Sequence, residues 1–136
     1  MIVVDTNILA SLYFPGPKNK MAEDLQLKSP LWLAPPLWKS EFRNVTALYF
    51  RKGLITYEEG LETLGKAEEL MREFEENVDF KRVFSLVKHS KCSCYDCEFV
   101  GLAIDFRVPL VTYDKLMLRE FPKVAVTHES YLGALV

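Results

Sequence analysis

The sequence predicts an α/β fold with a largely parallel sheet. Short β-branched segments alternate along the chain with amphipathic segments of helical spacing, and two of the strand segments are followed by an aspartate. Such alternation is typical of parallel strands joined by crossover helices. The 136 residues have the size of one ordinary domain, so we expect a single domain over residues 1–136.

Composition and charge narrow the classes of function. The formal net charge is −2 and the sequence pI is about 5.7, which excludes general electrostatic attraction to nucleic acid and leaves only local basic patches for such binding. No apolar run reaches the roughly 18 residues of a membrane span, and the N-terminus lacks the pattern of a signal peptide. We therefore expect a cytoplasmic protein without a membrane partner.

The N-terminal segment predicts a strand followed by two helices. Residues Ile2–Val4 form an apolar run suited to a strand that is buried on both faces. Asn7 is the expected N-cap of a helix that runs to Tyr13 and ends at residues 14–17, FPGP. A second helix is expected over Asn19–Leu27.

The next segment predicts a strand and a long helix. The strand spans Leu31–Ala34 and is stopped by two prolines. A helix over Leu37–Arg51 follows from apolar residues at helical spacing, with Gly53 as its stop. These apolar residues are Trp38, Phe42, Val45, Leu48 and Tyr49.

Two more helices are expected before residue 90. Thr56 and Glu59 form a capping-box pattern at the start of the first, which has one face marked by Leu61, Leu64, Met71 and Phe74. The second spans Phe80–Lys88.

The C-terminal part predicts helix, strand, strand and helix. Ser93 caps a helix over Cys94–Phe106, and strands follow over Leu110–Thr112 and Val124–Val126. A closing helix is expected over Glu129–Leu135. The residues of the first helix expected to pack inward are Phe99, Val100, Leu102, Ala103 and Phe106.

Four carboxylates are expected to face the protein. Asp5 and Asp114 follow strands whose carboxyl ends share one edge of a parallel sheet, where ligands bind. Glu41 shares the apolar face of its helix, and Asp96 lies in the first turn of its helix, on the face of Phe99. Four inward acids without matching cations would repel one another, so a divalent cation is the simplest compensation.

Each acid also has a purely structural interpretation. Asp5 could cap the first helix, and Asp96 could pair with Ser93 in a capping box. Glu41 could extend to solvent, and Asp114 could begin a turn before Lys115. Together, these interpretations require four separate coincidences.

The sequence resembles the PIN-domain family, and within it most closely the VapC toxins of type II toxin–antitoxin pairs. The resemblance is carried by VVDTNIL at the N-terminus, Glu41, YDCEFVGLA (95–103) and LVTYDKLM (110–117), and it spans essentially the whole chain. It implies a three-layer α/β/α fold around a central, mostly parallel sheet of four to five short strands. It also implies a metal-dependent endoribonuclease, with housekeeping RNA processing or non-catalytic RNA binding as alternatives.

The resemblance assigns catalysis to Asp5, Glu41, Asp96 and Asp114, which would hold Mg²⁺ or Mn²⁺ directly or through water. Both ions favour oxygen ligands. Asn7 and Thr112, polar and close to these acids in sequence, could hold a carboxylate or a water, or act only as local caps.

Partners are expected as well. The candidate phosphate contacts are Lys39, Arg43, Lys115 and Arg119, which lie near Glu41 or Asp114 in sequence. The resemblance implies a small cognate antitoxin and a homodimer. Core packing is the alternative use of the aromatic residues that could line such surfaces.

The segment HSKCSCYDC, residues 89–97, leaves three interpretations open. Its Cys92, Cys94 and Cys97 could be reduced packing residues, could bind zinc together with His89, or could serve a redox or disulfide role. The crowded spacing favours packing. The sequence lacks the motifs of other enzyme classes, such as a glycine-rich phosphate loop. A haloacid-dehalogenase-like site needs a second Asp two positions after the first, and this position holds Asn7.

Overall fold

A four-stranded parallel sheet forms the centre of the computed structural model, which describes residues 1–133. The strands are β1 (Ile2–Val4), β2 (Trp32–Leu33), β3 (Leu110–Val111) and β4 (Ala125–Val126), in the spatial order β2-β1-β3-β4. The α/β fold class and the parallel sheet predicted from the sequence are confirmed.

The two central strands, β1 and β3, have no exposed face. Val3 pairs with both Leu33 of β2 and Leu110 of β3, and the residues of β1 and β3 are at most 1% exposed. Burial on both faces explains why these segments consist of apolar residues without polar alternation. Because β1 and β3 are parallel neighbours, the residues that follow them emerge at the same edge of the sheet.

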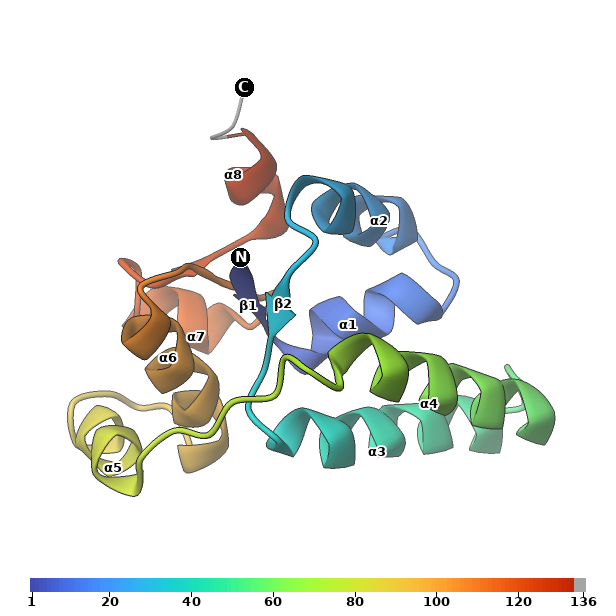
Figure 1. Cartoon of the computed structure of the whole chain (residues 1–136), viewed down its shortest axis with the longest axis horizontal. Coiled ribbons are helices and arrows are strands. Elements are labelled where there is room, and N and C mark those ends of the chain that lie inside the picture. Colours follow the sequence, from blue (N-terminus) through green and yellow to red (C-terminus); the bar gives the residue numbers. More distant parts are fainter. Residues whose placement is uncertain (134–136) are drawn as a thin grey trace.

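Helices cover both faces of the sheet, giving the three-layer α/β/α arrangement (Figure 1). Figure 1 shows α6 and α7 on one side of the strands, and α1 and α2 on the other. In the described part of the chain the helices are α1 (Thr6–Tyr13), α2 (Asn19–Lys28), α3 (Leu37–Arg51), α4 (Tyr57–Met71), α5 (Phe80–Lys88), α6 (Cys94–Phe106), α7 (Lys115–Glu120) and α8 (His128–Gly133).

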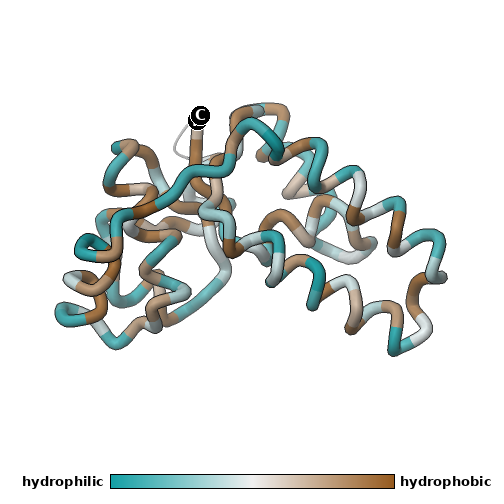
Figure 2. The backbone as a smooth tube through the Cα atoms, turned by 60° about the horizontal axis from the view of Figure 1, so that its bottom comes forward, coloured by the Kyte–Doolittle hydropathy of each residue, from teal (hydrophilic) through white to brown (hydrophobic). Residues whose placement is uncertain are grey.

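Helices α3 and α4 form an antiparallel arm that projects from the sheet, and hydrophobic and hydrophilic residues alternate along both (Figures 1 and 2). Gly53 turns the chain between them with φ = 73°, a conformation that favours glycine. Thr56 and Glu59 then form the expected capping box, with each side chain accepting from the other residue's backbone N–H. These local signals explain why the start of α4 was predicted correctly.

Several expected details are wrong. α1 begins at Thr6 and is capped by Asp5, so Asn7 is not its N-cap, because the carboxylate two residues earlier accepts from the first backbone N–H of the helix. Phe106 is 40% exposed and Leu61 is 53% exposed, so neither belongs to the core. The short helix α7 was not anticipated.

Element ends differ by one or two residues in other places. Each of the last three strands is shorter than expected, and α4 ends at Met71, before Phe74. The final helix begins at His128, and its expected end at Leu135 lies outside the described residues. No helix in residues 1–133 is both long enough and apolar enough to cross a membrane.

Candidate active site

Asp5 follows β1 directly and has both carboxylate oxygens engaged. The backbone N–H of Thr6 donates to Oδ1 at 2.8 Å, and the Thr112 hydroxyl donates to Oδ2 at 2.7 Å. The Asp5 backbone N–H also donates to the Val111 carbonyl at 3.1 Å, which continues the pairing of β1 with β3. Asp5 is thus both a helix cap, as one interpretation held, and a carboxylate fixed at the sheet edge.

Asp114 occupies the matching position after β3. It caps α7 by accepting from the Met117 backbone N–H at 2.9 Å. Its own backbone N–H donates to the Thr112 hydroxyl at 3.0 Å, so Thr112, which is fully buried, connects the two strand-end acids. The supporting role suggested for Thr112 therefore has a hydrogen-bonded basis.

Glu41 comes from the second turn of α3. Its Oε1 accepts from the Thr6 hydroxyl at 2.7 Å. The start of α3 is itself anchored, because the indole N–H of Trp38 donates to Glu75 at 2.8 Å and Glu75 forms a parallel bridge with Ala34. This packing places Glu41 half-buried beside α1 and does not let it extend freely into solvent.

Asp96 lies in the first turn of α6. Ser93 is the N-cap, and its hydroxyl accepts from the Asp96 backbone N–H at 3.1 Å. This is the cap that the sequence predicted, and burial raises the pKa of the Asp96 carboxyl against the smaller, lowering effect of its hydrogen bonds with Ser93. The Asp96 carboxylate is half-buried.

The four acids act on one another electrostatically. Burial raises the pKa of Asp5 to about 6, with the charges of Glu41 and Asp96 adding to the effect and the hydrogen bonds from Thr112 and Thr6 opposing it. Burial also raises the pKa of Glu41, helped by Asp96 and Glu98, and that of Asp96, helped by Asp114. The carboxylates therefore share one region of elevated negative potential.

No lysine or arginine in residues 1–133 forms an ion pair with any of these four acids. Among the expected phosphate contacts, Lys39 pairs with Glu75 at 3.5 Å and Arg43 pairs with Glu68 at 2.7 Å. Arg119 lies 4.0 Å from its neighbour Glu120, and Lys115 is exposed. The negative charge of the acids is thus uncompensated within the described chain.

The side chains do not form a closed metal cage. Within residues 1–133, no group of three or more His, Cys, Asp or Glu side chains is arranged to hold a metal ion. This applies equally to the cysteine segment, where Cys92 and Cys97 are buried, Cys94 is exposed and all three are free thiols.

Two polar residues of α1, Asn7 and Thr6, relate to the acids differently from what the sequence predicted. Asn7 is exposed, and its side chain makes no hydrogen bond to the acids within the described residues. Thr6, which sequence reasoning missed, holds Glu41. The Asp-Thr pair at the end of β1 was visible in the sequence, but nothing local showed that the hydroxyl reaches a residue 35 positions away.

Comparisons with known proteins support the fold. Neither a protein-family model nor a curated protein sequence matches the chain. The solved structure of PAE2754 from Pyrobaculum aerophilum superposes with a TM-score of 0.74 at 20% identity, covering 98% of this chain and 95% of that one. FitAcB from Neisseria gonorrhoeae also gives 0.74, at 15% identity, covering 95% of this chain and 99% of that one. These likenesses show that the chain has the PIN-like three-layer α/β/α fold.

Proposed function

We propose that the protein is a metal-dependent endoribonuclease that hydrolyses RNA phosphodiester bonds at Asp5, Glu41, Asp96 and Asp114. One observation carries the proposal: four carboxylates lie at the carboxyl edge of a parallel sheet and none has a cationic partner in the described chain. Structural capping accounts for Asp5 and Asp114 but does not account for the partial burial of Glu41, whose charge adds to the rise that burial causes in the pKa of Asp5. The PIN-like fold supports a nuclease.

The donor set fits Mg²⁺ or Mn²⁺. All the candidate ligands are carboxylate oxygens, which hard divalent cations prefer. An open site also agrees with Mg²⁺, because this ion keeps several of its waters and needs few protein ligands. Because no three of these side chains are arranged to hold an ion directly, Asp5, Asp96 and Asp114 would hold it in part through its waters, with Glu41 as a further ligand or as a partner of one of those waters.

The chain's own groups are arranged to hold these acids still. Thr112 fixes Asp5 and the backbone of Asp114, and Thr6 fixes one oxygen of Glu41, leaving Oε2 to orient an attacking water. When bound, a divalent ion would supply an activated water and stabilise charge on the phosphoryl and leaving oxygens. Hydrolysis of this kind needs no side-chain nucleophile.

Cleavage of a mixed pool of structured RNAs tests the function. Wild type should cut with added Mn²⁺ or Mg²⁺ and should not cut in EDTA, whereas Asp5→Asn should not cut under either condition. Asp79→Asn is the matched control, since Asp79 also caps a helix but lies outside the acid cluster. Cleavage by wild type and Asp5→Asn alike would contradict the proposal, and RNA binding without cleavage would favour a non-catalytic PIN domain.

Thermal shift measures the metal separately from catalysis. Mn²⁺ should raise the Tm of wild type and of Asp79→Asn, because binding to the folded state alone stabilises it. It should leave the Tm of Asp5→Asn nearly unchanged. Equal shifts in all three proteins would place the ion elsewhere.

We further propose that the chain acts as a toxin with a small cognate antitoxin and that it forms a homodimer, as its resemblance to VapC toxins implies. Exposed Phe80 and Phe84, 74% and 68% accessible and one turn apart on α5, give the chain an apolar surface that a partner could cover. Co-expression with the adjacent small open reading frame followed by purification tests the pair. Failure to co-purify would favour a housekeeping RNA-processing nuclease. Light scattering of the purified chain tests the homodimer separately, because it gives the molar mass in solution.

A further inference from the structure

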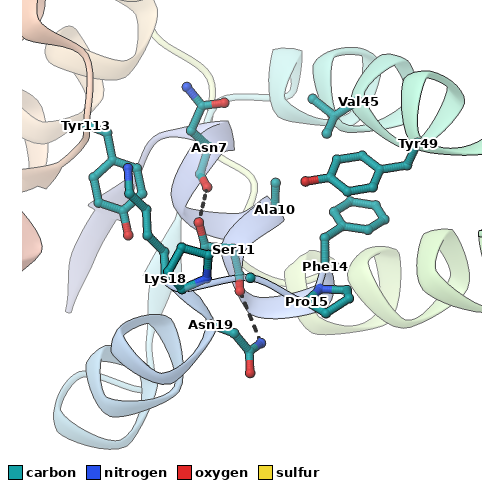
Figure 3. Close-up of a pocket in the computed structure, with 12 residues that line it drawn as sticks. Asn7, Ala10, Ser11, Phe14, Pro15, Lys18, Asn19, Val45, Tyr49 and Tyr113 are labelled. Carbon is teal, nitrogen blue, oxygen red and sulfur yellow. Dashed lines mark hydrogen bonds between the residues drawn. The ribbon is translucent and has the colours of Figure 1, made fainter. Parts of the chain in front are cut away.

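We propose that a cavity beside the acid cluster receives a base of single-stranded RNA next to the phosphate to be cut. This proposal rests on the proposed nuclease function and adds a subsite for the substrate. The cavity has a volume of about 460 Å³ and lies between α1, the α1–α2 loop, α3 and the residue before Asp114 (Figure 3). Binding pockets for small organic groups typically span about 300–1,000 Å³.

The cavity is continuous with the acid site along the chain. Asn7, which lines the cavity, comes two residues after Asp5, and Tyr113, which also lines it, immediately precedes Asp114. Val45 lies one helical turn beyond Glu41 on α3 and also lines it. A nucleic-acid strand held at the carboxylates would therefore pass the mouth of this cavity.

Aromatic rings border the cavity on both sides. Figure 3 shows Tyr113 on one side and Tyr49 with Phe14 on the other, with residues of α1 between them. The rings of Phe14 and Tyr49 are stacked, with centroids 4.2 Å apart and an interplanar angle of 13°. A flat aromatic group is the occupant that such walls suit best, and bases stack on aromatic side chains whatever their sequence.

A polar side chain without a protein partner also lines this region. The side-chain amide of Asn7 is exposed, makes no hydrogen bond to the described residues, and can both donate and accept. It offers the edge of a base hydrogen bonds that an aliphatic side chain could not provide.

A cation lies at the same mouth. The ammonium of Lys18 is 3.8 Å from the centroid of the Tyr113 ring, and Lys18 is exposed. The ion pairs that engage Lys39 and Arg43 leave Lys18 as a better-placed phosphate contact on this side of the acids. The combination of a cation, aromatic walls and the side-chain amide of Asn7, unpaired within the described residues, favours a nucleotide over an apolar peptide.

Photocrosslinking tests the subsite without requiring cleavage. The probe is a random 12-nucleotide single-stranded RNA with 4-thiouridine in place of uridine, irradiated with the full chain in EDTA. Mass spectrometry should locate crosslinks on Tyr49 or Tyr113, because Phe14 is only 4% exposed. Tyr49→Leu should weaken binding of the same RNA about 5- to 150-fold, the range for loss of one stacked base. Lys18→Ala, a change at an exposed position that should not affect folding, should weaken binding and reduce its salt dependence.

Tyr57→Leu is the matched control, because Tyr57 is a 60% exposed tyrosine on the same α3–α4 arm but outside the cavity. It should bind RNA as wild type does. The subsite would be overturned if crosslinks formed only outside the cavity and if Tyr49→Leu and Lys18→Ala bound RNA as wild type does. Cleavage of RNA by wild type with Mn²⁺ would, in that case, still support the nuclease proposal. If wild type neither binds nor cuts RNA and a protein partner alone covers the cavity, both the subsite and the nuclease proposal fail.

Discussion

The Thr112 hydroxyl donates to Asp5 Oδ2 at 2.7 Å, although the two residues are 107 positions apart in the sequence. The same hydroxyl accepts from the backbone N–H of Asp114 at 3.0 Å. One buried threonine therefore fixes the spacing of two acids that follow different strands. Because Thr112 is fully buried, it acts on these acids only through the two hydrogen bonds.

Thr112→Val should reduce both stability and cleavage. Valine keeps the shape but leaves the Asp114 N–H and the Asp5 carboxylate without a buried partner, a loss of about 1–3 kcal/mol. In the wild type, the hydrogen bond from Thr112 lowers the pKa of Asp5. Its loss in the variant should therefore raise this pKa further. Urea unfolding and RNA cleavage with Mn²⁺ measure the two effects.

Thr46→Val is the control for this substitution. Thr46 is also buried, at 4% exposure, but its hydroxyl donates to the Phe42 carbonyl within α3 and makes no hydrogen bond to any of the four acids. We expect a smaller loss of stability and unchanged cleavage. Equal effects of the two valine substitutions on cleavage would remove Thr112 from the site.

Two glycines in helices should respond to alanine with opposite signs. A Cβ at Gly101 in α6 would lie 2.9 Å from Val78 Cγ1 and 3.1 Å from Arg82 Cγ, whereas a Cβ at Gly65 in α4 would meet nothing within 4 Å. Gly101→Ala should therefore destabilise the fold by about 1–3 kcal/mol through overpacking. Gly65→Ala should stabilise it by about 0.5–1 kcal/mol, because alanine has the higher helix propensity. Urea unfolding of both variants gives the comparison, and a gain in stability for Gly101→Ala would show that Val78 and Arg82 move aside easily.

Local signals in the sequence explain which elements could be predicted. The bounds of α3, α5 and α6 were expected correctly, because apolar spacing and residues such as Gly53 and Ser93 mark them. The residue after α6, Arg107, is its C-cap and adopts the left-handed conformation with φ = 55°, a position where glycine is the usual sequence signal and is missing here. α7 was missed because its six residues carry too little periodicity to separate a helix from a turn.

The candidate site could be predicted only as far as strand ends and helix faces allow. The edge rule for parallel sheets was enough to put Asp5 and Asp114 together, since both follow a strand directly. The bond from Thr6 to Glu41 depends on how α1 packs against α3, which is a tertiary contact. The cavity at Tyr113 depends in the same way on the packing of four separate segments.

The three cysteines should differ sharply in reactivity. Cys92 and Cys97 are buried, and burial raises the pKa of both thiols, that of Cys92 to about 11. Cys94 is exposed. Iodoacetamide at pH 8 should therefore label Cys94 first, because only the thiolate reacts, and unfolded protein should be labelled at all three positions.

Mass spectrometry of the labelled peptides gives the rates for each cysteine. Zinc at one equivalent by elemental analysis, together with protection of Cys94, would instead support the metal interpretation of residues 89–97. Rapid labelling of Cys92 in folded protein would contradict the burial that the structure shows.

His128 should make the fold sensitive to acid. Its side chain is 1% exposed, and burial lowers its pKa, an effect that Lys18 adds to and Glu129 opposes. Tyr113 packs edge-on against the ring, and His128 Nδ1 is buried without a hydrogen-bond partner in residues 1–133, so a proton added there would have no acceptor.

The sign of the effect follows from proton binding. Since the folded pKa lies below the unfolded value of 6.5, the unfolded chain binds the proton first as the pH falls. The neutral form of His128 thus contributes fully to the free energy of unfolding above about pH 6.5. As the pH falls from there toward the folded pKa, this contribution is lost by no more than about 1.4 kcal/mol per pH unit.

Urea unfolding of wild type and His128→Phe between pH 7 and pH 4 isolates this contribution, because the carboxylates titrate in both proteins. The stability of wild type relative to the variant should fall with pH. His89→Phe, at the exposed second histidine, is the control and should follow wild type. A constant difference between wild type and His128→Phe would show that His128 accepts its proton as easily in the folded chain as in the unfolded one.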